Sequence, residues 1–267
     1  MKLTVISTRK EILTLQQHFE AAVVLDILRA TTTITTALSH GCQGVMPVTE
    51  VEEARRIASQ HDQVLLGGER GAVKLPGFHL GNSPLEYRQQ AVKGKRVVLT
   101  TTNGTGTIKL AAEKAPVVLI GSLLNARAVA TKLTGFNSVL LACAGTQGSF
   151  SLDDTVAAGY IIKELLAIKG GNNYSGQRLA AKRNGTDQWY AAEVPVDNAL
   201  TDVVLNDVAV AAYRCALYYG DNTLAALYDS LHGQKLAQLG MDDDLTYCAQ
   251  LNITDVVPCY KDDVIST

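Results

Sequence analysis

The sequence lacks the features that mark nucleic-acid-binding and disulfide-rich secreted proteins. Its 267 residues carry a formal net charge of −2, whereas nucleic-acid binding usually requires a basic patch or stripe. The cysteines are odd in number and scattered, and no C-x-x-C pair is present for zinc binding or thiol exchange. We therefore expect a cytoplasmic protein in a reducing compartment, without a nucleic-acid partner.

Long apolar runs are also missing. The segment from Met1 to Ser7 becomes polar too early for a signal peptide, and no run approaches the roughly 18 apolar residues that a membrane helix needs. Internal repeats and low-complexity tracts are absent. We expect a single globular domain over 1–267 with no membrane partner, and the 47% hydrophobic content is enough for a substantial core.

The common nucleotide and phosphatase signatures do not occur either. The segment from Gly104 to Lys109 lacks the last glycine of G-x-G-x-x-G, and no G-x-x-x-x-G-K-[ST] motif exists. Leu28 stands where a D-x-D phosphatase would carry its second aspartate after Asp26. A nucleotide is therefore not implied, and the mechanism of the D-x-D superfamily cannot be transferred.

What the sequence does contain is an alternation of predicted strands and helices. Short apolar, β-branched runs predict buried strands at 22–25, 44–48, 63–66, 96–99, 116–120 and 138–142. Helical spacing occurs at 31–39, 51–60, 84–90, 105–112, 125–133 and 152–166. This order predicts an α/β fold with three layers, α/β/α, around a largely parallel, mixed central sheet.

The C-terminal third has a different character. Glycine and asparagine clusters at 169–198 predict a surface excursion or a partner contact. Helices are expected near 199–218, 222–229 and 231–239, followed by a late edge strand at 255–258. The first of these helices is rich in alanine and tyrosine, so it could pack against a second copy, and we expect a homodimer.

Two predicted helices have a chemical start signal. Ser83 precedes Pro84, which places a capping residue before a first-turn proline. The segment from Ser151 to Asp154 resembles a capping box in which aspartate replaces glutamate.

Glycine, hydroxyl, amide and charged residues are concentrated in a few short motifs. Most of these motifs follow a predicted strand, and the carboxyl ends of parallel strands share one edge of a sheet. We therefore expect them to surround one pocket for an anionic, phosphorylated small molecule. The motifs are Asp26–Thr33, Gly68–Gly71, Gly77–Pro84, Thr100–Thr105 and Cys143–Asp154.

The first two motifs each have a structural and a functional interpretation. Asp26 could simply cap a helix, or it could bind Mg²⁺ or act as nucleophile or base beside an anion-clamping Arg29; we favour the second. Glu69 and Arg70 lie among glycines that bring backbone close to a ligand, which favours a binding role. Lys74 is a further cation for the substrate.

The other motifs leave more open. Asn82 and Ser83 are equally typical of a turn with a helix cap. The loop formed by Thr101, Thr102, Asn103, Gly104 and Thr105 lies at a predicted helix start, where phosphate is attracted, although a plain turn is the alternative. In the last motif Gly145 is a substrate-binding candidate and Cys143 is interpreted as packing. Of Asp153 and Asp154, one would cap the helix and the other bind metal.

Taken in order, these motifs resemble the 2-phosphosulfolactate phosphatase family, and the resemblance extends to the tail from Ser230 to Pro258. It implies a Mg²⁺-dependent phosphatase that hydrolyses 2-phospho-3-sulfolactate in coenzyme M biosynthesis, on an α/β/α fold. The chain departs from the expected pattern at His79, where the resemblance leads us to expect aspartate.

The residues and the resemblance together give one set of candidates. The catalytic candidates are Asp26, Arg29 and Glu69, and the Mg²⁺ ligands are Asp26, Glu69, Asp153 and Asp154. The substrate-binding candidates are Arg70, Asn82, Ser83, Thr101, Thr102, Asn103, Gly104, Thr105 and Gly145. Two other functions stay open: a phosphatase for a simpler 2-phospho-hydroxy acid, and a non-catalytic protein that binds a phosphorylated metabolite.

Overall fold

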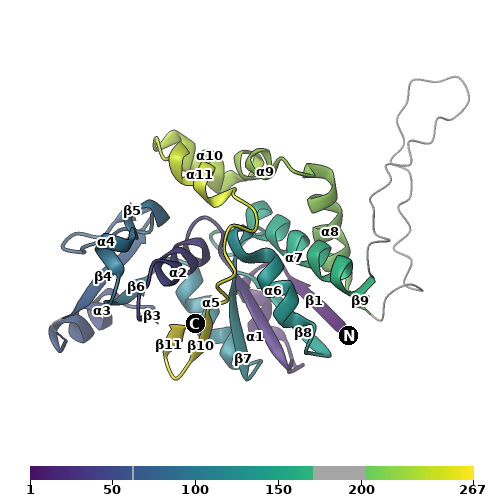
Figure 1. Cartoon of the computed structure of the whole chain (residues 1–267), viewed down its shortest axis with the longest axis horizontal. Helices are drawn as coiled ribbons and strands as arrows, with labels where there is room; N and C mark the ends of the chain where they lie inside the picture. The colour runs from purple at the N-terminus through teal and green to yellow at the C-terminus, as the bar shows by residue number, and fades with distance from the viewer. Residues whose placement is uncertain (62, 171–202) are drawn as a thin grey trace, which may run out of the picture.

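The computed structural model describes residues 1–61, 63–170 and 203–267 (Figure 1). Within them, the strands form an eleven-stranded sheet in the order β5-β4-β6-β3-β11-β10-β7-β2-β8-β1-β9. The excursion predicted at 169–198 lies outside the described residues from position 171 onward.

The sheet consists of two parallel blocks joined by an antiparallel hairpin. The larger block contains β7 (Val117–Gly121), β2 (Ala21–Leu25), β8 (Ser138–Cys143), β1 (Lys2–Ile6) and β9 (Val204–Leu205). The smaller block contains β4 (Val64–Arg70), β6 (Arg96–Thr100) and β3 (Gly44–Val48), with β5 (Val73–Lys74) antiparallel at its edge. The predicted α/β fold with a largely parallel, mixed sheet is confirmed.

The hairpin of β10 (Cys259–Lys261) and β11 (Val264–Ser266) lies in the middle of the sheet. β10 pairs with β7 and β11 pairs with β3, both antiparallel. The late edge strand predicted at 255–258 is therefore wrong in both position and role. Strands of three residues give too short a pattern to be located from sequence, and their neighbours are set by the tertiary fold.

Helices cover both faces of the sheet because its central strands are apolar on both sides; all five residues of β2 are buried. On one face α1 (Arg9–Thr14), α2 (Ala30–Ser39) and α5 (Gly104–Ala112) share a core that includes Ile34 and Ile108. On the other face α6 (Ala126–Leu133) and α7 (Leu152–Gly170) share a core with Val23 and Leu141. The three-layer prediction is confirmed.

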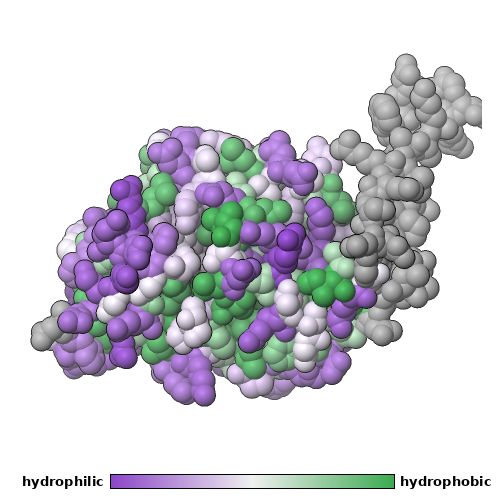
Figure 2. Space-filling view, viewed as in Figure 1, coloured by the Kyte–Doolittle hydropathy of each residue, from purple (hydrophilic) through white to green (hydrophobic). Residues whose placement is uncertain are grey.

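Outer helices complete the molecule. α8 (Asp207–Tyr219) packs on α7, where Gly159 lies so close to the carbonyl of Ala212 that no Cβ would fit. α9 (Thr223–Asp229), α10 (Leu231–Gln238) and α11 (Asp242–Cys248) lie together at one end of the molecule (Figure 1). α3 (Val51–Ser59) covers the smaller block. Figure 2 shows hydrophilic side chains over the end formed by this block, with hydrophobic patches toward the middle of the same face.

Some element boundaries differ from the sequence prediction. The helix predicted at 84–90 is divided into the 3-10 helix η1 (Pro84–Glu86) and α4 (Gln89–Val92). The Ser83 cap is confirmed, since its hydroxyl accepts the N–H of Leu85. No helix in the described part of the chain is both long and apolar enough to cross a bilayer.

We predict that the β10–β11 hairpin holds the two parallel blocks together. Ile265 of β11 is fully buried and pairs with Val45, so Ile265→Ala should lower the free energy of unfolding by roughly 2–5 kcal/mol. The neighbouring Ser266 is exposed, and Ser266→Ala should change it by less than about 0.5 kcal/mol. Urea unfolding followed by circular dichroism measures both, and equal effects would contradict the role of the hairpin.

Candidate functional site

A cavity of about 530 Å³ lies where the loops after β2, β4, β6 and β8 meet α10. The acids Asp26, Glu69 and Asp153 all line it, although they are far apart in the sequence. The expectation that residues after neighbouring parallel strands surround one pocket is therefore met by these three carboxylates.

Asp26 follows β2, accepts a backbone N–H at the start of α2 and faces the cavity. Its backbone N–H donates to Thr31 Oγ1 at 3.1 Å, and its Oδ1 accepts the N–H of Ala30 at 3.4 Å. The two interpretations of Asp26 are therefore compatible. Gly104 lies directly against it: a Cβ there would come within 2.8 Å of Asp26 Oδ2, so only glycine allows α5 to start this close.

Glu69 is held in one orientation by three donors. Its Oε2 accepts the N–H of Ala72 at 2.8 Å, and its Oε1 accepts the N–H and the hydroxyl of Thr102 at 2.8 and 2.9 Å. The carboxylate is 7% exposed. Because Oε2 has a single protein donor, one of its lone pairs is left for a ligand.

Asp153 and Asp154 are neighbours with different surroundings. Asp153 lines the cavity and accepts the hydroxyl of Ser151 at 2.5 Å. Asp154 does not line it; its two oxygens accept the N–H groups of Ile27 and Gly145. The capping-box prediction is wrong, because the Asp154 carboxylate accepts from the loops after β2 and β8 and not from the start of its own helix. The metal-ligand role of Asp154 stays a prediction. Because both oxygens of Asp154 already have backbone donors, Asp153 is the better candidate.

Burial and repulsion from neighbouring carboxylates raise the pKa values of Asp26 and Asp154. Burial, followed by the negative charges of Glu69 and Asp153, raises the pKa of Asp26 to about 7. Burial and the charge of Asp153 also raise the pKa of Asp154 well above its usual value. The cavity thus holds more negative charge than it can stabilise without a cation or a proton.

Helix N-termini supply positive potential at the same place. Leu28 and Arg29 precede α2, Thr102 and Asn103 precede α5, and Asp153 lies in the first turn of α7, all along the cavity lining. The positive end of a helix dipole attracts phosphate and other anions. The site therefore combines carboxylates that suit a hard cation with helix ends that suit a phosphate.

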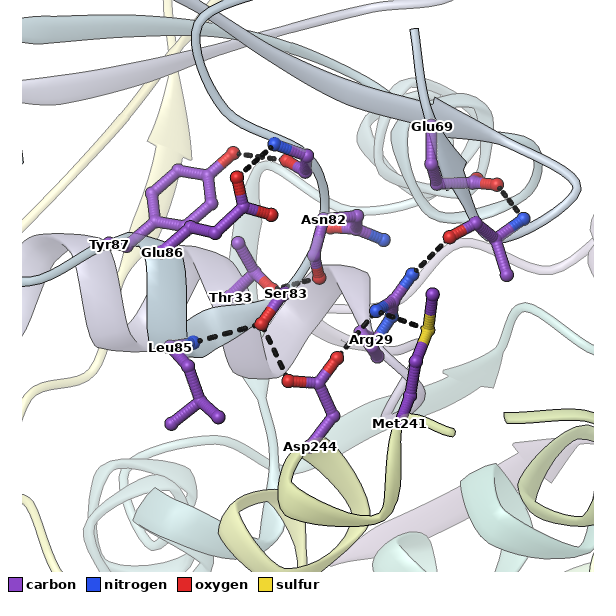
Figure 3. A network of polar contacts seen from close by, with 12 residues as sticks. Arg29, Thr33, Glu69, Asn82, Ser83, Leu85, Glu86, Tyr87, Met241 and Asp244 are labelled. Atoms are coloured by element: carbon purple, nitrogen blue, oxygen red, sulfur yellow. Dashed lines mark hydrogen bonds and ion pairs between the residues drawn. The ribbon is translucent and has the colours of Figure 1, made fainter. Parts of the chain in front are cut away.

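Arg29 belongs to a buried network (Figure 3). Its guanidinium donates to Asp244 Oδ2 at 2.5 Å, to the carbonyl of Ala72 at 2.7 Å and to the sulfur of Met241 at 3.2 Å. Asp244 in turn accepts the hydroxyl of Ser83. Arg29 lines the cavity, but its charge is largely compensated by Asp244, and the pair ties α11 to the site.

Asn82 points toward the side of the network where Arg29 and Glu69 lie (Figure 3). It lines the cavity, is 4% exposed, and its Oδ1 has no hydrogen-bond partner among the described residues. A buried amide oxygen without a partner is costly, so a ligand or an ordered water is the expected partner. This observation fits the predicted binding role of Asn82.

Other sequence candidates lie beside the cavity and do not line it. Arg70 donates to backbone carbonyls of Glu69 and Thr49 and to the hydroxyl of Thr100. Thr101 and Thr105 bond to each other, and Ser83 belongs to the Arg29 network. Gly145, with φ at +71°, has no room for a Cβ beside the carbonyl of Ser149. Their binding roles stay predictions, and the observed contacts are structural.

Cys143 has the packing role that the sequence favoured, and His79 also has a structural role. Cys143 is fully buried, and burial raises the pKa of its thiol well above the usual value. His79 is exposed, and its Nδ1 accepts the N–H of Leu66 at 3.0 Å. Neither side chain lines the cavity.

The sequence analysis missed the contribution of α10. Ser230, Leu231, His232 and Lys235 line the cavity, together with Thr146, Gln147 and Phe150 of the loop after β8. α10 follows no predicted strand, so the shared edge of the parallel strands gave no reason to expect it at the cavity. A histidine and a lysine three residues apart lie on one face of a helix, and this spacing was the available signal.

The donor set fits Mg²⁺ in part. Within the described residues, no group of three or more histidine, cysteine or acidic side chains is arranged to hold a metal ion. Mg²⁺ is usually bound through one or two carboxylates, with substrate phosphate and waters filling its other positions. Glu69 and Asp153 meet this requirement, since both line the cavity and retain oxygen lone pairs.

We predict that metal-free protein loses stability as the pH rises from about 4 to about 7. Native Asp26 keeps its proton up to about pH 7, while the unfolded chain releases it near 3.8. Stability should therefore fall by roughly 4 kcal/mol between about pH 4 and pH 7 through this residue. Urea unfolding in EDTA across this range tests it. Asp26→Asn should flatten the dependence, and an unchanged slope in this variant would contradict the assignment.

Comparison with known proteins identifies one family. A family model described as 2-phosphosulpholactate phosphatase matches residues 7–263. A "Probable 2-phosphosulfolactate phosphatase" from Symbiobacterium thermophilum is 42% identical over 244 residues, covering 90% of this chain and 91% of the relative.

Other relatives have the same printed name. The protein from Carboxydothermus hydrogenoformans is 41% identical over 240 residues, covering 90% of this chain and 85% of the relative. The protein from Clostridium beijerinckii is 36% identical over 270 residues, covering 100% of this chain and 99% of the relative. The similarity therefore spans the whole cavity lining.

Proposed function

Because the chain belongs to the 2-phosphosulfolactate phosphatase family, we propose that it is a Mg²⁺-dependent phosphatase that hydrolyses 2-phospho-3-sulfolactate to 3-sulfolactate and phosphate. The observation that carries the proposal is the convergence of Asp26, Glu69 and Asp153 on one cavity beside helix N-termini. The enzyme would be cytoplasmic, as the composition leads us to expect, and would serve coenzyme M biosynthesis, as the resemblance implies. The homodimer stays a prediction.

In this proposal Glu69 and Asp153 hold the cation. Glu69 is fixed by Ala72 and Thr102, and Asp153 by Ser151, so both carboxylates are preorganised. When bound, Mg²⁺ would neutralise the phosphate and stabilise the charge that develops as the ester breaks. Thr102 and Asn103 at the start of α5 would orient the phosphate oxygens.

Asp26 would act as the general base. A base is most effective when its pKa lies near the working pH, and in the metal-free site that of Asp26 is raised to about 7. Its carboxylate would take a proton from the attacking water as the water oxygen bonds to phosphorus. The phosphorus–oxygen bond to the ester then breaks, the leaving oxygen takes a proton from a water molecule and becomes the hydroxyl of sulfolactate, and Asp26 returns its proton to solvent.

The nucleophile role of Asp26 is the alternative, and it predicts a covalent phosphoenzyme. Acid quenching during turnover of a radiolabelled phosphoester separates the two roles. A base leaves the protein unlabelled, whereas a nucleophile leaves labelled Asp26.

We predict phosphate release from 2-phosphosulfolactate with Mg²⁺ and none with excess EDTA. Asp26→Asn should lower kcat by at least about 100-fold, the effect expected for a general base, while circular dichroism shows an unchanged fold. The panel should include phospholactate and phosphoglycolate. A preference for these would favour the simpler 2-phospho-hydroxy acid, and tight binding in EDTA without phosphate release would favour the binding protein.

We also predict that Asp153 and Asp154 differ in effect. Asp153→Asn should raise the Mg²⁺ concentration needed for half-maximal activity by at least about 10-fold, with a small change in stability. Asp154→Ala should instead destabilise the fold by roughly 3 kcal/mol, because two buried N–H groups lose their acceptor. Mg²⁺ titrations and urea unfolding of both variants check this, and a reversed pattern would exchange the two assignments.

A further inference from the structure

The cavity contains two basic side chains that the proposed hydrolysis does not use. His232 and Lys235 of α10 line it together with the carboxylates. Asp153, Lys235, Arg29 and Glu69 all act electrostatically on His232, which lines the same cavity as these residues. Within the described ranges, neither His232 nor Lys235 forms a hydrogen bond or ion pair with a protein acceptor.

Arg29 is a poorer candidate for binding a second anionic group. Its guanidinium already donates to Asp244 and to the carbonyl of Ala72, and Asp244 compensates its charge. Asp229 also lines the cavity, and its Oδ2 accepts the hydroxyl of Tyr219 at 2.8 Å. Of the arginine and the lysine that line the cavity in the described part of the chain, Lys235 is therefore the one without a direct ionic partner.

The substrate of the proposed function has three anionic groups. In the proposed function its phosphate would be bound by the cation that Glu69 and Asp153 hold and by the helix start at α5, and its carboxylate is on the carbon that carries the phosphate. A sulfonate is weakly basic and is a poor ligand for a hard cation, so it needs hydrogen-bond donors from the protein. An ammonium and an imidazole N–H are suitable donors.

We propose that His232 and Lys235 bind the sulfonate of the substrate and so select it over phosphoesters without a sulfonate. The proposal rests on the proposed function and assigns the specificity of that site to α10. The Ser230 hydroxyl caps this helix by accepting the N–H of Gly233 at 2.9 Å, which fixes the first turn and with it His232.

The test compares two substrates in each variant. Lys235→Met should lower kcat/KM for 2-phosphosulfolactate by roughly 10- to 100-fold, mainly through KM, as expected for a lost charge-assisted hydrogen bond. The same change should affect phospholactate by less than about 3-fold, so the ratio between the substrates falls. His232→Gln should shift the ratio in the same direction, and Lys235→Arg should restore most of it.

A matched control removes a lysine charge elsewhere. Lys132 of α6 is exposed and does not line the cavity, so Lys132→Met should leave the substrate ratio unchanged. An equal loss on both substrates in Lys235→Met would overturn the sulfonate assignment.

Calorimetry with the product separates this inference from the proposed function. Wild-type protein should bind 3-sulfolactate more tightly than lactate, and Lys235→Met should remove the difference. If wild-type protein shows this preference but hydrolyses no phosphoester, the phosphatase proposal fails and the sulfonate site stands. If Lys235→Met binds 3-sulfolactate as tightly as wild-type protein does, the sulfonate site is refuted.

Discussion

Repulsion among buried carboxylates is the constraint on which this site depends. Asp26, Glu69 and Asp153 share one cavity, and the first of them responds with a pKa raised to about 7. Like charges in a low-dielectric cavity destabilise the fold unless protons, donors or cations compensate them. Each acid is accordingly held by donors of its own loop or the next, and helix N-termini add positive potential. A cation would reduce the remaining repulsion and would in turn attract an anionic ester. The arrangement that lowers the stability of the metal-free protein is therefore the one that favours binding.

The C-terminal region completes this arrangement from outside the parallel sheet. β10 and β11 join the two strand blocks, and the Arg29–Asp244 pair attaches α11 to the loop after β2 (Figure 3). A buried ion pair contributes little net stability when compared with apolar packing, but loss of one partner is costly. The pair is therefore better understood as fixing where the C-terminal helices lie, and thus where α10 presents its side chains to the cavity.

The sequence predicted the parts of the site that depend on topology. Parallel strands share one carboxyl edge, and this rule alone brought Asp26, Glu69 and Asp153 together. The rule could not give the direction of individual side chains. Arg70 donates to Thr49 and Thr100 and does not line the cavity. Asp154 points away from Asp153 because neighbouring residues on a helix point about 100° apart. The rule also could not place β10, β11 or α10, because their positions result from long-range packing with no local pattern.

His79 departs from the family pattern, and its position in the structure decides whether this difference affects the substrate. In sequence, a histidine where aspartate is expected suggests a changed substrate. In the structure this side chain is exposed, accepts the N–H of Leu66, and lies outside the cavity lining. Aspartate can accept the same N–H through a carboxylate oxygen, so the exchange leaves the carboxylates and cations of the site unaltered. Substrate choice would therefore depend on the residues that line the cavity, and His232 and Lys235 on α10 are the ones that we propose distinguish a sulfonate from a methyl group.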